Sequence, residues 1–154
     1  MKKILWLIFL VLLAVLSYYR EVLFISINAV IAGSDVFYAK TTEVDFFLGK
    51  SPQTLVNYKY IMTIGFTAFF ALLTTIGLRL SFKNKLPFYF AITIYGICAI
   101  IAMLVLIYSA TTNSFDNVYS FLRLIIEYLH NLLIYLIISA SFLGYSYSKK
   151  QRLA

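Results

Sequence analysis

The sequence has few charged and few turn-forming residues for its length. Only 12% of its 154 residues are charged and 62% are apolar, with 6 Gly and 2 Pro. An ordinary soluble domain has about 25% charged and about 45–50% apolar residues. This composition excludes a soluble monomer, and the scarcity of polar residues also excludes a disordered tail. The single cysteine excludes an internal disulfide and a site built from several thiolates.

Four long apolar stretches fill most of the chain instead. A helix needs about 20 mostly apolar residues to cross the hydrocarbon core of a bilayer. The stretches that reach this length are at about 4–32, 57–80, 86–108 and 118–148, and residues 33–56 form one long outer loop. The first stretch also resembles a signal peptide, but we expect it to be retained as a span. The sequence therefore predicts an all-α polytopic membrane protein, a single membrane domain with four transmembrane helices.

Basic residues are divided unequally between the two ends of the predicted helices. One end has eight basic residues and no acid: Lys2, Lys3, Arg79, Lys83, Lys85, Lys149, Lys150 and Arg152. The other end has five basic residues and all six acids: Arg20, Lys40, Lys50, Lys59, Arg123, Glu21, Asp35, Glu43, Asp45, Asp116 and Glu127. Because Lys and Arg are enriched in cytoplasmic loops, we expect both termini to be cytoplasmic. The net charge of +7 thus indicates topology; the expected partners are the lipid bilayer and other membrane-protein subunits, and no nucleic acid.

Ionisable and amide side chains recur in the outer halves of the first and last stretches. Such groups are costly inside a membrane, and their spacing places them on one face of each helix. The candidate polar network consists of Arg20, Glu21, Asn28, Arg123, Glu127, His130 and Asn131. Two interpretations stay open. The arginines pair with glutamates of the other helix, or each charge reaches interfacial water by itself.

Small residues predict how the second span packs. Lipid gives apolar helices no hydrophobic reason to associate, so residues that allow a close approach of backbones mark contact faces. The predicted packing face has a spacing of four and consists of Thr63, Thr67, Ala71 and Thr75. In the outer loop, the apolar segment Phe46-Phe47-Leu48 lies either on the membrane surface or at the outer end of the bundle.

The sequence offers little for catalysis. Glu127 and His130 form one Glu-x-x-His motif, whereas a carboxylate-bridged di-iron site needs two such motifs and two further glutamates. The neighbours of Cys98 include no charge that would lower the pKa of its thiol. We therefore predict no catalytic residue, no metal and no cofactor. The alternative is a membrane enzyme or haem protein in which His130 is a haem ligand or transfers protons.

Several segments have a pattern in common with a known family. They are Arg20-Glu21-Val22-Leu23-Phe24, Val118-Tyr119 to Arg123, Leu132-Leu133, Ala140, Phe142, Tyr145 and Lys149-Lys150. In these segments the chain resembles the small four-span membrane proteins encoded beside exosortases in Bacteroidetes. It lacks the Phe-Tyr-Asp-Pro sequence, the second arginine and the proline in the last span that the family pattern has. The resemblance implies a non-enzymatic inner-membrane partner of a protein-sorting or surface-anchoring system, and it carries over no catalytic residue.

The short chain leaves little beyond its predicted spans. The sequence therefore predicts a non-enzymatic accessory or assembly subunit of a larger membrane complex. The expected location is a bacterial inner membrane, with an organellar inner membrane as the alternative. The alternative function is a small oligomeric channel or transporter that has the polar cluster at the outer leaflet as its entrance.

Overall fold

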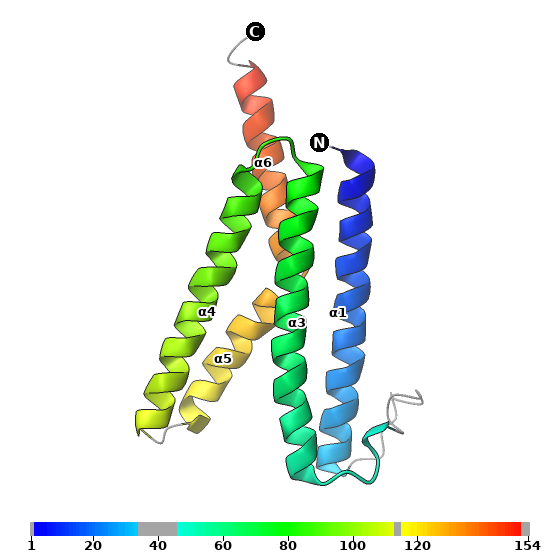
Figure 1. The fold of residues 1–154 in the computed structure, drawn as a ribbon, viewed down its shortest axis with the longest axis vertical. Helices are drawn as coiled ribbons and strands as arrows, with labels where there is room; N and C mark the ends of the chain where they lie inside the picture. Colours follow the sequence, from blue (N-terminus) through cyan, green and yellow to red (C-terminus); the bar gives the residue numbers. More distant parts are fainter. Residues whose placement is uncertain (1, 34–45, 113–114, 152–154) are drawn as a thin grey trace.

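A computed structural model of the chain describes residues 2–33, 46–112 and 115–151, which form five α-helices (Figure 1). The helices are α1 (Lys3–Ala32), α3 (Pro52–Ser81), α4 (Leu86–Thr112), α5 (Phe115–Leu129) and α6 (Leu133–Gln151). Three of them, α1, α3 and α4, contain stretches long and apolar enough to cross a membrane, and α5 and α6 qualify together as a bent pair. The described part of the chain is all-helical as predicted. Its three or four candidate spans are consistent with a membrane protein.

Helices α1 and α3 form an antiparallel pair along their length (Figure 1). At one end, the backbone N–H of Lys2 donates to the carbonyl of Ser81 at 2.8 Å. Toward the other end, the amino group of Lys59 donates to Oδ1 of Asn28, also at 2.8 Å. These two contacts fix the register of the pair.

The ends of the pair follow local sequence signals. Pro52 stands in the first turn of α3, and Oγ of Ser51 accepts the N–H of Thr54 at 3.2 Å. This is the N-cap that a Ser-Pro sequence predicts. Helix α1 ends before Gly33, which has φ 61° in the left-handed region that favours glycine. Its N–H bonds back to the carbonyl of Val30.

The apolar core is divided into two clusters. The larger cluster joins α1, α3, α4 and α6 and consists of Leu13, Phe70, Leu78, Phe82, Ala91, Tyr135 and Ile138. The smaller one joins α1 and α3 near the start of α3 and consists of Ile27, Phe47 and Leu55. Of the three apolar loop residues, Phe47 is therefore buried against the end of the bundle, whereas Phe46 and Leu48 are exposed.

The last apolar stretch, expected at about 118–148, is divided into α5 and α6, which meet at an angle of 58°. Freed backbone groups at such a break must find other partners when water is absent. Here the hydroxyl of Tyr95 donates to the carbonyl of Leu129 at 3.3 Å, and Oδ1 of Asn131 accepts the N–H of Leu133 at 3.1 Å. Two backbone groups at the break are thus satisfied by side chains, one of them from α4.

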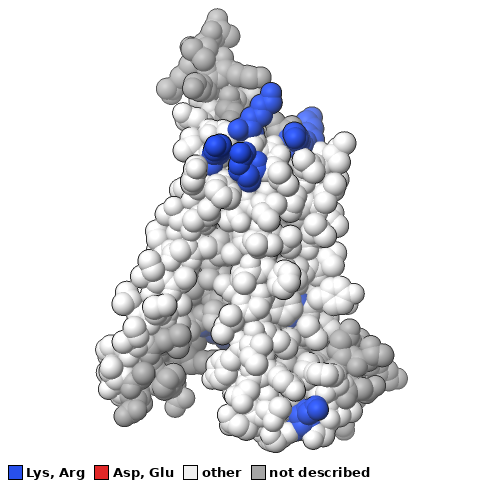
Figure 2. Space-filling model, in the orientation of Figure 1, with Lys and Arg blue, Asp and Glu red and all other residues white. Residues whose placement is uncertain are grey.

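Basic side chains gather at the end of the bundle where α1 begins and α3 ends. Lys2, Lys3, Arg79, Lys83 and Lys85 are all exposed there. Figure 2 shows these basic atoms above a wide belt with little charge. Helix α6 ends at the same end of the bundle at which α1 begins (Figure 1).

Candidate functional site: a polar cavity between four helices

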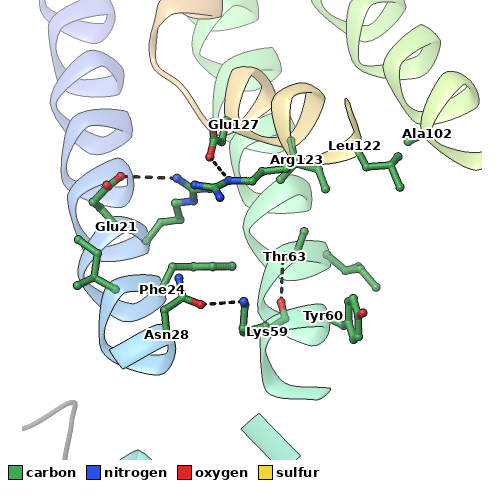
Figure 3. A pocket seen from close by; sticks show the side chains of 14 residues that line it. Glu21, Phe24, Asn28, Lys59, Tyr60, Thr63, Ala102, Leu122, Arg123 and Glu127 are labelled. Atoms are coloured by element: carbon green, nitrogen blue, oxygen red, sulfur yellow. Dashed lines mark hydrogen bonds and ion pairs between the residues drawn. The ribbon is translucent and has the colours of Figure 1, made fainter. Parts of the chain in front are cut away.

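A cavity of about 590 Å³ lies between α1, α3, α4 and α5 (Figure 3). On α3 its lining runs from Lys59 to Ile64, between the residues that α3 gives to the two apolar clusters. The polar part of the wall consists of Arg20, Glu21, Asn28, Lys59, Tyr60, Thr63, Arg123 and Glu127. The apolar part consists of Phe24, Ile25, Ile64, Ala102, Leu122 and Ile126. Five of the seven predicted network residues therefore line one cavity.

The ion pairs in this wall lie within single helices. Nε of Arg123 is 2.8 Å from Oε1 of Glu127, one turn further along α5. Nη1 of Arg20 is 3.6 Å from Oε2 of Glu21, its neighbour on α1. Residues four apart on a helix meet without help from a second helix. In the described part of the chain, neither arginine forms an ion pair with a glutamate of the other helix, which differs from the first of the two interpretations.

Arg20 is largely enclosed in the wall. Only 16% of its side chain is exposed, and its guanidinium carbon lies 5.0 Å from the centre of the Phe24 ring. This distance allows a cation–π interaction. Its Nε is buried and has no hydrogen-bond partner among the described residues. Arg20 thus has a donor without an acceptor in the described part of the chain.

Lys59 completes the cationic part of the wall. It reaches from α3 toward α1, where Asn28 accepts its hydrogen bond (Figure 3). Within the part of the chain that the structure describes, no carboxylate lies within ion-pair distance of Lys59. Sequence reasoning counted Lys59 only among the outer basic residues and missed its contact with Asn28. One signal in the sequence could have predicted this contact. Lys59 lies near the start of the second span, at a depth in the membrane comparable to that of Asn28.

His130 and Asn131, the other two predicted network residues, belong to the break between α5 and α6. His130 is 2% exposed, and its Nε2 is 2.6 Å from Oγ1 of Thr67. The Thr67 hydroxyl already donates to the carbonyl of Thr63, so Nε2 of His130 carries the proton and donates. The imidazole stacks on Phe70 with 5.6 Å between ring centres. His130 therefore holds the break against the middle of α3.

The predicted packing face of α3 is half-buried along its length, at Thr63, Thr67, Ala71 and Thr75. The hydroxyls of its three threonines donate to carbonyls of α3 itself, and that of Thr67 also accepts from His130. The most buried residues of α3 follow a neighbouring line at Leu55, Phe70, Thr74, Gly77, Leu78 and Ser81.

Gly77 lies at a tight contact between α3 and α1. A Cβ placed on this glycine would lie 2.8 Å from Cγ and 2.9 Å from Cβ of Phe9. No other residue type fits this position without a shift of α1. The sequence pattern of small residues at a spacing of four did not include Gly77.

The cavity has the chemistry of a binding site for an anion. Three cations and two carboxylates are among its described lining residues, next to apolar side chains. Among residues 2–33, 46–112 and 115–151, no three His, Cys, Asp or Glu side chains are grouped as a metal site requires. Comparisons with protein-family models, curated proteins and solved structures found no match.

Proposed function

We propose that the chain is a non-enzymatic accessory or assembly subunit of a larger membrane complex. In this proposal it spans a bacterial inner membrane four times, with α5 and α6 as one broken span. Both termini are then on the cytoplasmic side, because the end of the bundle with the exposed lysines is the one that resists translocation. A role in protein sorting or surface anchoring belongs to the same proposal and is based on the family resemblance.

The observation that carries this proposal is the use of buried polar side chains as links between helices. Thr74 on α3 lies 3.3 Å from the hydroxyl of Tyr95 on α4. Ser81 on α3 lies 3.3 Å from the hydroxyl of Tyr135 on α6. Together with the bond between Thr67 and His130, these contacts tie both later spans to α3. Such links favour a rigid scaffold over a chemically active interior.

The helices of this scaffold also leave wide apolar surfaces free. Only 6% of the spanning segment of α1 is buried inside the chain, and 11% of that of α4. In a membrane these surfaces are available to lipid or to the helices of another subunit. Packing through such surfaces is how membrane subunits associate, which supports an accessory role.

A channel or transporter is the second candidate, and the cavity favours it. Charged side chains next to a broken helix are typical of transporter binding sites. Toward the basic end of the bundle, however, the larger apolar cluster fills the space between the helices, with Leu13, Phe70 and Tyr135 all fully buried. A polar path across the membrane would therefore need a second copy of the chain or a rearrangement of this core.

Copurification from native membranes separates the two candidates. The chain, tagged after Gln151 and present at its natural level, would be cross-linked, extracted in a mild detergent and analysed by quantitative mass spectrometry. An accessory subunit is expected to carry one or more membrane proteins at a constant molar ratio, which an untagged strain does not yield. Recovery of the chain alone, together with substrate flux in liposomes that contain only this chain, would refute the accessory role.

A further inference from the structure

Two cations from facing helices, Lys59 and Arg20, line the cavity. Lys59 on α3 has only the neutral amide of Asn28 as its side-chain partner among the described residues. Arg20 on α1 has a buried Nε–H without an acceptor in the described part of the chain. A buried donor without a partner is unfavourable, and a charged acceptor gives the strongest hydrogen bond to it. An anion in the cavity would give Lys59 a charged acceptor in addition to Asn28.

The two carboxylates of the wall do not already fill this role. Glu127 is held by Arg123 on the same helix, and Glu21 is 64% exposed beside Arg20, at 3.6 Å. Lys59 is therefore the cation of the wall without a described carboxylate partner. Lysine and arginine are the side chains that bind phosphate oxygens, as a point charge and as a planar fork respectively.

The position of Lys59 suits the head group of a lipid. It lies about 10 Å from the start of α3 at about 1.5 Å per residue, so it stands near one end of the spanning helix. The head groups of a bilayer occupy about 5–8 Å on each side of a hydrocarbon core of about 30 Å. A cation near the end of a spanning helix is therefore within reach of lipid phosphate.

The rest of the cavity suits an acyl chain. From the polar wall, the lining continues over Ile64 of α3, Ala102 of α4, and Leu122 and Ile126 of α5. Helices α3 and α4 diverge toward this end of the bundle, and α5 lies beside them (Figure 1). A site whose wall contains both cations and aliphatic side chains matches an amphiphile better than a free ion.

We propose that this cavity binds the phosphate group of a membrane lipid, with Lys59 as the donor and with an acyl chain along Ile64, Ala102 and Ile126. The binding is independent of whether the chain is an accessory subunit. Inorganic phosphate has the same oxygens without an acyl chain. An experiment must therefore distinguish binding of a lipid from binding of free phosphate.

The test uses the purified full chain in a neutral detergent, with three probes: dioleoyl phosphatidylglycerol, dioleoylglycerol and sodium phosphate. Dioleoylglycerol has the same acyl chains and no phosphate. Native mass spectrometry and the shift of the thermal unfolding temperature measure binding. We expect phosphatidylglycerol to bind at least about tenfold more tightly than dioleoylglycerol, the factor that one charge-assisted hydrogen bond provides.

Two pairs of variants locate the binding. Lys59→Met should weaken phosphatidylglycerol binding roughly tenfold, whereas Lys83→Met, an exposed lysine at the other end of the bundle, should leave it within about twofold. Ala102→Phe should fill the acyl part of the cavity and weaken binding, whereas Ala99→Phe, on an exposed position of α4, should not. Circular dichroism and size-exclusion chromatography establish that each variant is folded.

Three results would overturn the proposal. The first is equal affinity for phosphatidylglycerol and dioleoylglycerol, which needs only the wild-type chain and so does not depend on the folding of any variant. The second is an equal effect of the two lysine substitutions. The third is stabilisation by sodium phosphate that matches the lipid and is unchanged by Ala102→Phe, which would assign the site to a free anion.

Discussion

Replacement of Gly77 by alanine tests the contact that holds α1 and α3 together. The new Cβ would meet Phe9 at its Cγ, Cβ and Cδ1, at 2.8–3.0 Å. Rotation of the Phe9 side chain cannot relieve all of these contacts, because the Cβ of Phe9 is fixed to the backbone of α1. The helices must therefore move apart locally. Gly65 is the matched control, since it lies in the same helix and a Cβ placed there has nothing within 4 Å.

The expected magnitude follows from two opposing effects. Forcing an extra methyl group into a tight contact costs about 1–3 kcal/mol. Alanine favours a helix over glycine by about 0.5–1 kcal/mol, and this gain applies at both positions. The gain cancels when the two variants are compared. We expect Gly77→Ala to be less stable than Gly65→Ala by about 1–3 kcal/mol.

Reversible unfolding in mixed detergent micelles, followed by circular dichroism, measures this difference. Purified wild type, Gly77→Ala and Gly65→Ala would be compared at the same detergent ratio. In a double-mutant cycle, Gly77→Ala should cost less in a Phe9→Ala background than in the wild type, because Phe9→Ala removes Cγ and Cδ1, two of the three atoms that the new Cβ meets. Equal stabilities of the two glycine variants would mean that α1 and α3 do not approach each other at Gly77.

Two further predictions concern polar contacts. Thr67→Val removes the acceptor of the buried His130 Nε2–H and should lower the free energy of unfolding by about 1–3 kcal/mol. The control is Thr75→Val, because the Thr75 hydroxyl bonds only to its own helix. This variant should lower the free energy of unfolding by less than about 0.5 kcal/mol. Thermal unfolding in detergent measures both, and equal losses would argue against the contact with His130. In double-mutant cycles, Arg123 and Glu127 should couple by about 0.3–0.5 kcal/mol, as an exposed pair one turn apart on a helix does, and Arg20 and Glu127 by less. A larger coupling for Arg20 with Glu127 would restore an ion pair between α1 and α5.

The sequence was most informative where one local signal decides the structure. Long apolar stretches predicted α1, α3 and α4, because spanning length and composition can be read without tertiary contacts. The caps at Ser51-Pro52, where α3 starts, and at Gly33, where α1 ends, are signals of the same kind, because caps depend on only a few neighbouring residues.

Features that depend on contacts between distant residues were not predictable in the same way. The break between α5 and α6 requires Tyr95, far away in sequence, to satisfy the carbonyl of Leu129. No proline or glycine marks the break, and its two polar residues, His130 and Asn131, do not by themselves predict a bend. The close approach at Gly77 depends in turn on which residue of α1 lies opposite, which a pattern within one helix does not contain.

In the candidate site, too, contacts within one helix were predictable from the sequence and contacts between helices were not. Spacing on one helix placed Arg123 and Glu127 on a common face, where the structure pairs them. The place of the network residues in the outer halves of the first and last apolar stretches brought both parts of the polar network to one region, and five of its members line the cavity. The contact of Lys59 with Asn28 joins two helices, so it appeared only once their register was known.

The side of the membrane on which α6 ends tests the central claim that α5 and α6 form one broken span. Single cysteines at Lys50, Lys83 and Gln151, all exposed, would be introduced into a Cys98→Ala background and treated with an impermeant thiol reagent in intact cells. We expect the cysteine at position 50 to react and those at 83 and 151 to be protected until the cells are opened. Reaction at both 50 and 151 would mean that α5 and α6 enter and leave the membrane on one side, which would contradict four crossings.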